Sequence, residues 1–278
     1  MRVDLRRLTR IEEFRQCEQL QDRIWGPDDI GRVSSLVLIT AEDNGGSAIG
    51  AFVDEDRLVG FVCSFLGFAD NGTLKLCSVL MAVDLELQKG GIGYHLKLAQ
   101  REAALAQGVE LITWTFDPLA SLNAHLNIHK LGCVTSRYLV NCYGIAQGGI
   151  NAGLPTDRFL VEWWVGKPWV DSRLRGMPAE PTAGARWVNE VAPHPHTGLP
   201  VCQGCALDLD DPVLLVEIPE NIRTLKMADI DLARSWRLEL RRVFPHYFAQ
   251  GYQVTGFSRR EHGGAMRPCY ILSRGDVV

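Results

Sequence analysis

The sequence predicts an α/β protein with ordered parts at both ends and a proline-rich segment between them. Strand-like apolar runs alternate with segments of helical periodicity along the first half, which is the pattern of mixed α/β folds. A length of 278 residues with 46% hydrophobic residues is enough to bury a core without disulfides or a metal. Seven of the 13 prolines lie between Gly166 and Pro212, which predicts a linker or an extended arm there.

The first elements are predicted from periodicity and turn residues. Apolar residues at helical spacing among charges indicate an amphipathic helix over residues 11–24. Two runs rich in Val, Ile and Phe, residues 47–52 and 57–65, flank an acidic turn at residues 54–56, which indicates a β-hairpin. A further strand is expected over residues 73–83.

The middle of the chain continues the alternation of helix and strand. Apolar spacing predicts a helix over residues 94–107 that ends at Gly108. The same spacing predicts a helix over residues 119–131, and Gly132 ends it. Short apolar runs predict strands over residues 111–116, 138–143 and 159–165.

The C-terminal part is predicted to form a small β-α-β-β module. It comprises a strand over residues 213–218, an amphipathic helix over residues 230–250, and a hairpin of residues 252–257 with residues 269–272. A unit of about 65 residues is at the low end for independent stability, so we expect it to pack on the first domain. The expected organisation is an N-terminal domain of residues 1–166, a linker of residues 167–211 and a C-terminal module of residues 212–278.

Charge and cysteine content restrict the expected location and partners. The net charge of −4, from 29 basic and 33 acidic residues, argues against a dedicated nucleic-acid or membrane-surface binder. The first residues mix both charges without an apolar segment, so no secretory signal is expected. Most of the eight cysteines lie in apolar runs, which is typical of reduced, buried cysteine. These features predict a cytoplasmic protein with neither nucleic-acid nor membrane partners.

The stretch from Val79 to Lys97 carries the clearest chemical signal. An apolar strand runs into a glycine-rich turn and a helix begins at once, so the first helical N–H groups have no partner within the helix. These groups and the positive end of the helix dipole form an anion site suited to a pyrophosphate. Glycine at positions 90, 91 and 93 removes the Cβ atoms that would block the approach, and Lys89 adds a positive charge. The alternative is a plain strand-to-helix turn that needs glycine for its geometry.

This loop and a later helix resemble two motifs of the GNAT acyltransferases. Gln88-x-x-Gly91-x-Gly93 resembles the (Gln/Arg)-x-x-Gly-x-(Gly/Ala) motif, which cradles the pyrophosphate of acetyl-CoA in that family. The segment from Ser121 to Gly132 resembles the family's Asn-x-x-Ala-x-x-x-Tyr-x-x-x-Gly helix. The resemblance covers about residues 1–165 and is to a branch with an added C-terminal module. It implies a GNAT-like mixed, mostly antiparallel sheet flanked by helices.

The resemblance implies acetyl-CoA as the acyl donor. In the family, the strand before the loop splays from the next strand, and the pantetheine arm pairs with its backbone, here at Met81 and Val83. Backbone N–H groups near Met81 and Ala82 are expected to stabilise the oxyanion of the transfer reaction. The expected cofactor-binding residues are Met81, Ala82, Val83, Gln88, Lys89, Gly90, Gly91, Ile92, Gly93, Tyr94, Ser121 and Asn123.

Departures from the family's pattern leave the acid–base pair open. Ile128 stands at the family's usual catalytic Tyr position, Ser121 stands at its Asn, and no Glu lies on the strand before the loop. Asp117 is a candidate base that takes a proton from an amine, and the alternative is a helix N-cap or turn residue. His129 shares a helix face with His125 and is a candidate acid for the leaving thiolate, or else a solvent-facing or satisfied histidine.

Two histidines and two cysteines lie close together in the proline-rich segment. His194-Pro-His196 and Cys202-x-x-Cys205 place four zinc-type ligands within twelve residues. A His-x-His pair ahead of the cysteines is uncommon in standard zinc fingers, so unrelated loop residues are the preferred interpretation. No metal site is assigned.

Together these features predict an acyltransferase that moves an acetyl or other acyl group from CoA to an amine of a small molecule or peptide. Transfer is expected to be direct, within a ternary complex. The alternative function is a catalytically silent acyl-CoA-binding or assembly module, which Ile128 and the missing Glu favour. A further interpretation makes the C-terminal part the dimerisation element of a homodimer. No feature of the sequence identifies the acceptor.

Overall fold

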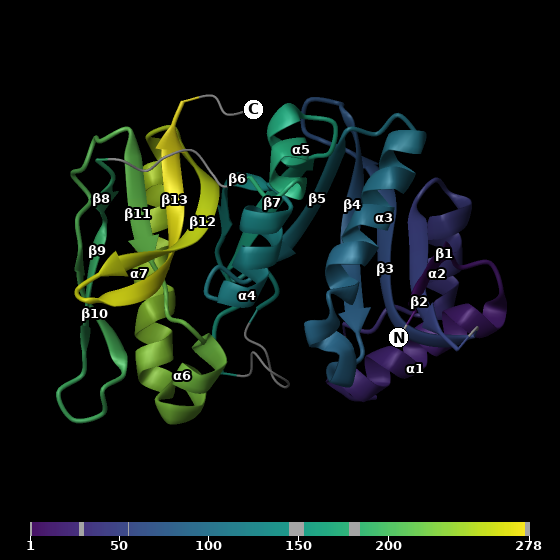
Figure 1. Ribbon diagram of the computed structural model, residues 1–278, viewed down its shortest axis with the longest axis horizontal. Coiled ribbons are helices and arrows are strands. Elements are labelled where there is room, and N and C mark those ends of the chain that lie inside the picture. Colours follow the sequence, from purple (N-terminus) through teal and green to yellow (C-terminus); the bar gives the residue numbers. More distant parts are fainter. Residues whose placement is uncertain (1, 28–30, 55, 145–152, 178–183, 276–278) are drawn as a thin grey trace. The chain divides into compact units, whose positions relative to one another are not determined.

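A computed structural model describes residues 2–27, 31–54, 56–144, 153–177 and 184–275. These residues form two compact units. Unit 1 holds Met1–Trp114 with Trp164–Gly166, and unit 2 holds Thr115–Trp163 with Lys167–Val278. The chain passes from one unit to the other within strands β5 (Leu111–Phe116) and β7 (Arg158–Trp164) (Figure 1), and a third time between Gly166 and Lys167.

Unit 1 is built on a sheet with the strand order β1-β2-β3-β4-β5. Neighbouring strands are antiparallel except β4 and β5, which run parallel, so the predicted mixed, mostly antiparallel class is confirmed. Besides β5, the strands are β1 (Asp4–Arg7), β2 (Ser47–Val53), β3 (Arg57–Phe68) and β4 (Leu74–Val83). The helices are α1 (Ile11–Trp25), α2 (Ser35–Asp43), the 3₁₀ helix η1 (Leu85–Gly90) and α3 (Ile92–Ala106).

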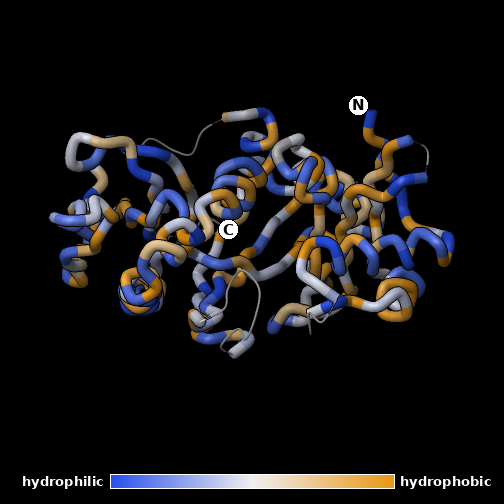
Figure 2. The backbone as a smooth tube through the Cα atoms, turned by 90° about the horizontal axis from the view of Figure 1, so that it is seen from below, coloured by the Kyte–Doolittle hydropathy of each residue, from blue (hydrophilic) through white to orange (hydrophobic). Residues whose placement is uncertain are grey.

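Helices cover both faces of this sheet. Phe14 of α1 and Leu38 of α2 are buried in one apolar cluster together with Phe61 of β3. Ile92 of α3 is buried in a second cluster, which contains Val62 of β3. Because side chains alternate along a strand, Phe61 and Val62 point to opposite faces, and α3 therefore lies across the sheet from α1 and α2. Hydrophobic and hydrophilic residues alternate along the helices, as expected for elements with one buried face (Figure 2).

Glu13, in the first turn of α1, is a fully buried carboxylate with several hydrogen-bond donors. The backbone N–H groups of Thr9 and Arg10 donate to its Oε2 at 2.9 and 3.1 Å. The guanidinium groups of Arg6 and Arg10 donate to its Oε1. Burial alone would raise the pKa of this carboxyl, but the hydrogen bonds to its charged form lower the pKa to about 2.

We expect Glu13→Gln to lower the free energy of unfolding of unit 1 by about 1.5–3 kcal/mol at neutral pH, because hydrogen bonds to a charged group are lost. The folded-state pKa lies below the unfolded one, so the carboxylate stabilises the fold above about pH 4.5 and loses this effect toward pH 2. The difference between wild type and variant, measured by urea unfolding at several pH values, should shrink as the pH falls through this range. A constant difference would contradict the assignment.

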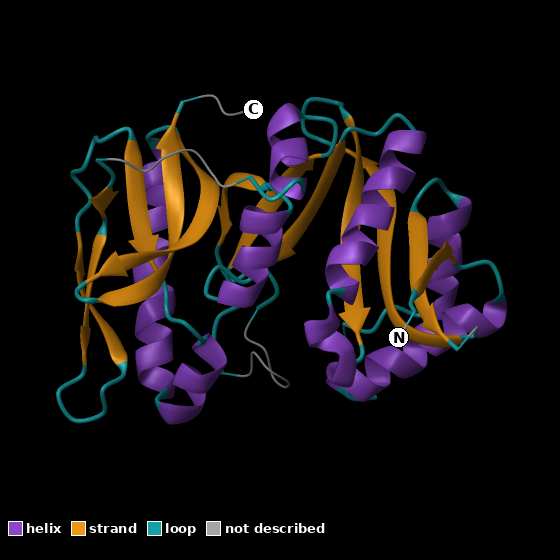
Figure 3. Cartoon of the chain, in the orientation of Figure 1, coloured by secondary structure: helices purple, strands orange, loops and turns teal. Residues whose placement is uncertain are grey.

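The sheet strands of unit 2 follow the order β7-β6-β12-β13-β11-β8, and β9 and β10 form a separate pair (Figure 3). Neighbouring strands are antiparallel where β6, β7, β11, β12 and β13 meet, and β11 runs parallel to β8. The strands are β6 (Val134–Leu139), β8 (Arg186–Trp187), β9 (Asn189–Pro193), β10 (Pro200–Cys205), β11 (Val213–Glu217), β12 (Tyr252–His262) and β13 (Ala265–Arg274). The helices are α4 (Ser121–Ala124), the π helix η2 (His125–Lys130), α5 (Pro168–Leu174), α6 (Ile222–Ala228) and α7 (Ile230–Ala249).

The predicted C-terminal β-α-β-β module is present as β11, α7, β12 and β13. Helix α7 buries Trp236 and Phe244, and the Phe244 ring packs edge-to-face on Phe159 of β7 with centroids 4.6 Å apart. Strand β12 joins β6 through Val254 and Thr135. The module therefore shares one core with the segment that holds α4, β6 and β7.

The proline-rich segment of residues 167–211 contains regular structure in its described part, whereas the sequence predicts a linker or an extended arm. Helix α5 and strands β8, β9 and β10 lie within it. Pro168 occupies the first turn of α5, and Pro193 and Pro200 lie at the ends of β9 and β10. The backbone N–H that proline lacks is not needed for hydrogen bonding in the first turn of a helix or at the end of a strand. These prolines are therefore compatible with the short helix and strands in which they lie. The predicted division into a domain of residues 1–166, a linker of residues 167–211 and a module of residues 212–278 remains a prediction.

The remaining predicted elements form with shifted bounds. The helix predicted over residues 119–131 forms as α4 and η2, and the strand predicted over residues 138–143 forms earlier, as β6. Helix α2 was not indicated by the sequence pattern, and its N-cap Ser34 accepts a hydrogen bond from the N–H of Val37 at 3.4 Å. Among the helices in the described ranges, none has both the length and the apolar character needed to cross a bilayer.

Candidate functional site

Strands β4 and β5 of unit 1 separate after a short stretch of pairing. Among the described residues, β5 pairs with β4 only where Lys75–Cys77 lie opposite Leu111–Thr113. Strand β4 continues for six residues beyond this point, to Val83, and stays paired with β3 on its other side. The second half of β4 therefore has backbone groups that face the side from which β5 has separated.

The register of β3 and β4 identifies which backbone groups these are. The N–H of Asp84 donates to the carbonyl of Val59 at 2.8 Å, so these two residues form a hydrogen-bonded pair. Hydrogen-bonded and non-hydrogen-bonded pairs alternate along an antiparallel ladder, so the amides and carbonyls of Met81 and Val83 point away from β3. The same alternation directs the backbone of Ala82 toward β3. A backbone contact of Ala82 with a ligand on the β5 side, expected from the resemblance, is therefore not supported by the register.

The start of α3 follows β4 directly and has the features of an anion site. Gly91 is the N-cap of the helix, with φ 78° and ψ 2°, and no side chain caps the first turn. The first hydrogen bond within the helix is that of the His95 N–H with the Gly91 carbonyl at 3.1 Å. The preceding amides, those of Ile92, Gly93 and Tyr94, belong to the first turn, which holds no acidic residue. The positive end of a 15-residue helix is thus not neutralised by its own first turn.

At two of the three glycine positions in the loop, the structure gives a steric or conformational reason for glycine. Gly91 has the positive φ that L side chains rarely adopt. A Cβ on Gly93 would lie 3.3 Å from the Met81 Cε and 3.8 Å from a Val83 methyl, so the helix start packs closely on the end of β4. A Cβ on Gly90 would meet nothing within 4 Å, so no steric reason for glycine is present there.

The other loop residues expected to bind the cofactor lie on η1 or at the helix start. Gln88 on η1 donates from Nε2 to the carbonyl of Val83 at 3.3 Å, which fixes this side chain beside the end of β4. The backbone of Lys89 belongs to η1, and its side chain lies outside the described part of the chain. Tyr94 is half-buried on the first turn of α3, with its ring 5.7 Å from that of His95.

A buried lysine lies at the point where β4 and β5 separate, and the sequence interpretation did not identify it. Lys97 of α3 is 2% exposed, and its ammonium donates to the Ser78 hydroxyl at 2.9 Å and to the Gln100 side chain at 3.0 Å. It also lies 3.7 Å from the centre of the Trp114 ring, a cation–π contact. One feature of the sequence could have indicated this buried lysine. Lys97 and Gln100 lie on the face of the helix that also carries the buried Leu96.

The candidate base Asp117 lies in unit 2, directly after β5, and its carboxylate is held by several donors. Arg237 of α7 donates from both terminal nitrogens to its two oxygens at 2.6 Å each. The backbone N–H of Leu119 donates to Oδ1 at 2.9 Å, so the turn role considered as the alternative is present. Arg158, also of unit 2, has Nη1 at 3.9 Å from Oδ2.

The second candidate, His129, lies on η2 of unit 2 and stacks on His125 with ring centroids 4.7 Å apart, so the predicted shared face is confirmed. Its Nδ1 lies 3.0 Å from the carbonyl oxygen of Phe257. A carbonyl only accepts, so Nδ1 carries the proton and, in the neutral ring, Nε2 is left as the acceptor. Burial, with His129 as a second cause, lowers the pKa of His125. Ile128 is fully buried beside them.

Ser121 and Asn123, the other residues expected to contact the cofactor, lie on α4 in unit 2. The Ser121 hydroxyl donates to the carbonyl of Glu220 at 2.5 Å, so its proton is used in a contact within the unit. Asn123 is exposed. Their contact with a cofactor remains a prediction.

No family model matches the sequence, and no curated protein matches it. Solved structures are similar in fold. An acetyltransferase of the GNAT family from Streptococcus pneumoniae matches with 15% identity and a TM-score of 0.47, over 58% of this chain and 98% of the other. The ribosomal-protein-S18-alanine N-acetyltransferase from Escherichia coli matches with 12% identity and a TM-score of 0.46, over 60% and 96%. Naa50 from Arabidopsis thaliana, in complex with a bisubstrate analogue, matches with 18% identity and a TM-score of 0.45, over 58% and 97%.

Proposed function

We propose that this chain binds an acyl-CoA, with acetyl-CoA as the expected donor, and transfers the acyl group to an amine. The observation that supports the proposal most is the combination, within unit 1, of an uncapped helix start and a strand edge left by the separation of β5 from β4. The first feature suits a pyrophosphate, and the second suits a ligand with two amide groups in an extended chain. CoA carries both.

The proposed binding mode uses backbone groups for both halves of the cofactor. The amides of Ile92, Gly93 and Tyr94 hold the pyrophosphate at the positive end of α3. The backbone groups of Met81 and Val83 pair with the amides of the pantetheine arm, which then adds to the edge of β4 as an extra strand. A protein with a net charge of −4 can hold such a polyanion because backbone dipoles and not surface charge make the site.

The proposed reaction is direct attack of the amine nitrogen on the thioester carbonyl within a ternary complex. The C–N bond forms and the C–S bond breaks, the oxyanion is stabilised by the N–H of Met81, and the thiolate leaves with a proton. Asp117, as the base, and His129, as the acid for the leaving thiolate, remain the proposed groups for proton transfer. The Nδ1 proton of His129 is donated to the Phe257 carbonyl, so His129 would transfer a proton through Nε2, whereas both oxygens of Asp117 are bonded to Arg237.

Isothermal calorimetry with the full chain tests the binding step. We expect CoA and acetyl-CoA to bind with Kd values below about 1 mM, and inorganic pyrophosphate to bind more weakly, since it lacks the arm that pairs with Met81 and Val83. Absence of binding by CoA would contradict the proposal. Equal affinity for CoA and pyrophosphate would contradict the strand-like pairing while leaving the anion site in place.

A catalytically silent acyl-CoA-binding module is the second candidate function. Two observations favour it: buried Ile128 stands at the family's Tyr position, and Arg237 holds both oxygens of Asp117. Release of free thiol from acetyl-CoA in the presence of a panel of amines distinguishes the two functions. Turnover that falls in His129→Ala supports the transferase. Tight binding of CoA with no turnover on any amine supports the silent module.

A further inference from the structure

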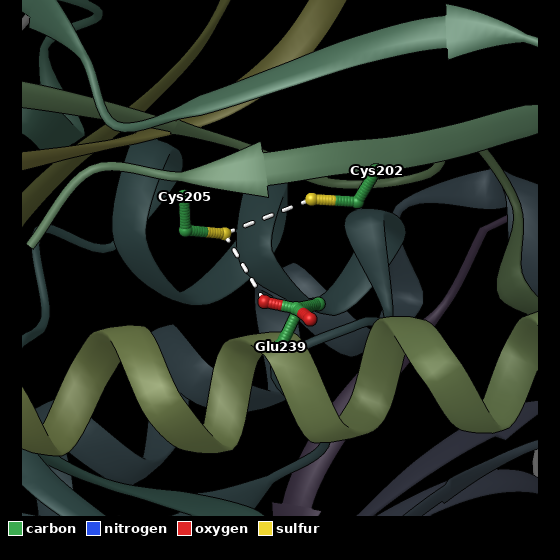
Figure 4. A group of neighbouring side chains, drawn as sticks. All are labelled: Cys202, Cys205 and Glu239. Atoms are coloured by element: carbon green, nitrogen blue, oxygen red, sulfur yellow. Dashed lines mark hydrogen bonds between the residues drawn. The ribbon is translucent and has the colours of Figure 1, made fainter.

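Three side chains with metal-ligand atoms converge in unit 2, apart from the proposed acyl-donor site. Cys202 and Cys205 lie on β10, and Glu239 lies on α7. One ligand atom from each residue lies within 4.8 Å of the other two. Figure 4 shows the two thiols on the side of the strand that faces the helix, with the carboxylate pointing up between them.

A β-bulge brings the two cysteines to the same face of β10. In a regular strand, residues three positions apart point to opposite faces, because side chains alternate. Here Cys202 lies opposite Val191, and Cys205 lies opposite Asn189, two residues away on β9, with a register shift between Cys202 and Gly204. The extra residue, Gln203, restores a common direction for the two thiols. The bulge thus converts a spacing unsuited to a strand into a pair of convergent ligands.

The distances match those of a tetrahedral zinc site. The two sulfur atoms lie 3.7 Å apart, and the Cys205 sulfur lies 3.4 Å from Oε2 of Glu239. With Zn–S bonds of about 2.3 Å and Zn–O bonds of about 2.1 Å, the edges of a tetrahedron come to roughly 3.8 Å for S–S and 3.6 Å for S–O. Two of the three edges therefore already have the spacing that one ion requires, and the third, between Cys202 and Glu239, is no longer than 4.8 Å.

The surrounding contacts hold these ligands in place. Asn189, which is 1% exposed and pairs with Cys205 across the two strands, is itself fixed by hydrogen bonds of 3.0 and 2.8 Å with the backbone of Glu217. Trp236, one turn before Glu239 on α7, donates its indole N–H to the carbonyl of Pro200 at 2.8 Å, so the strand is docked on this face of the helix. Arg242, one turn further along α7, has Nη2 at 3.7 Å from Glu239 Oε2.

We propose that Cys202, Cys205 and Glu239 bind one zinc ion, with the fourth position open to water or an external ligand. Two thiolates select a soft, borderline metal over magnesium or calcium, and zinc accepts the carboxylate as a third ligand. Each thiol gives its proton to solvent as its Zn–S bond forms, and no electron is transferred. The ion would connect the pair of β9 and β10 to α7.

This ligand set differs from the four residues that the sequence spacing brings together. The Nδ1 atom of His194 accepts the backbone N–H groups of His196 and Thr197 at 3.3 and 3.4 Å, so this nitrogen is used within its own turn. In the described part of the chain, the ligand atoms that come within 4.8 Å of one another are those of Cys202, Cys205 and Glu239, and neither histidine belongs to this group. The proposal therefore predicts that the histidines are dispensable for zinc.

The test uses the full chain, stripped of metal under reducing conditions and then titrated with zinc or with cobalt as a spectroscopic substitute. We expect about one zinc per chain by elemental analysis, and a thiolate-to-cobalt charge-transfer band for the cobalt form. Cys202→Ser, Cys205→Ser and Glu239→Gln should each lose bound zinc, and the two serine variants should lose the charge-transfer band. Because Glu239 is half-buried on a helix surface, Glu239→Gln tests the site without removing a core side chain.

Two matched controls complete the test. Cys142→Ser removes an exposed thiol elsewhere in unit 2, and His194→Ala removes a histidine of the sequence-based set. Both should retain full zinc content and the cobalt band. A fully reduced wild type that binds no zinc overturns the proposal, as does zinc retained by both serine variants. A Cys202–Cys205 disulfide that persists under the reducing conditions, seen as six titratable thiols in place of eight, also overturns it.

Discussion

Replacing Arg237 with Ala is expected to lower the free energy of unfolding of unit 2 by about 3–5 kcal/mol. Arg237 is 2% exposed and donates two parallel hydrogen bonds of 2.6 Å to the carboxylate of Asp117. The variant removes the guanidinium and leaves a buried carboxylate without its main counter-charge, and little water can reach it. Denaturant unfolding followed by circular dichroism measures the loss.

The pair can also be tested from the carboxylate side. Burial alone would lower the pKa of Arg237, but the hydrogen bonds and charge of Asp117 raise it, so the carboxylate stabilises the charged guanidinium. Asp117→Asn retains the shape and the contact with the Leu119 N–H but removes the charge that Arg237 requires. We expect a destabilisation of similar order. In Arg237→Ala, Arg158 still lies 3.9 Å from Asp117 and neutralises part of its charge. The loss of stability in Arg237→Ala should therefore lie toward the lower end of the range.

A surface arginine of the same helix provides the control. Arg234 pairs with Asp231 at 2.6 Å on the exposed side of α7, and Arg234→Ala should change the free energy of unfolding by no more than about 0.5 kcal/mol. The double variant Arg237→Met with Asp117→Leu should recover much of the loss, since it leaves no buried charge. Equal effects of the two single arginine variants would show that the Arg237 pair is solvated, contrary to its burial.

Asp117 illustrates which part of a site can be predicted from sequence. Its position between a strand and a proline predicted a turn or cap role, and the hydrogen bond from Leu119 two residues away is such a local contact. Arg237 lies 120 residues further along the chain, and no local pattern links the two. The feature that decides whether Asp117 has a free oxygen therefore arises only when α7 packs in unit 2.

The same distinction applies to the fold. The acidic turn at Asp54 correctly predicted the hairpin, in which Val53 pairs with Arg57, because turn residues act locally. The bulge at Gln203 was not predictable, because it depends on how β10 pairs with β9. Helix α2 was missed because its apolar residues show no clear helical period, and Leu38 and Ala41 are its buried residues.

Gly91→Ala is expected to weaken the binding of CoA by about tenfold to 100-fold, a prediction that depends on the proposed function. Gly91 has φ 78° at the N-cap of α3, and an L residue pays about 1–2 kcal/mol for this conformation. The chain can relieve the strain by rotating the peptide, which turns the amides of Ile92 and Gly93 away from a common point. Losing one hydrogen bond to a charged phosphate costs about 1.5–3 kcal/mol, which corresponds to the expected change in Kd. Calorimetry with CoA measures it.

Gly108, at the other end of α3, separates strain from binding. It has φ 71°, and a Cβ there would meet nothing within 4 Å, so Gly108→Ala introduces the same backbone strain without a steric clash. Both variants should lose about 1 kcal/mol of stability, but only Gly91→Ala should lose affinity for CoA, since the anion site uses the N-terminal end of the helix. Equal losses of CoA affinity in the two variants would mean that backbone strain anywhere in α3 weakens binding by destabilising unit 1. No loss in either variant would mean that the phosphates bind elsewhere, and the glycines of the loop would then serve the turn alone.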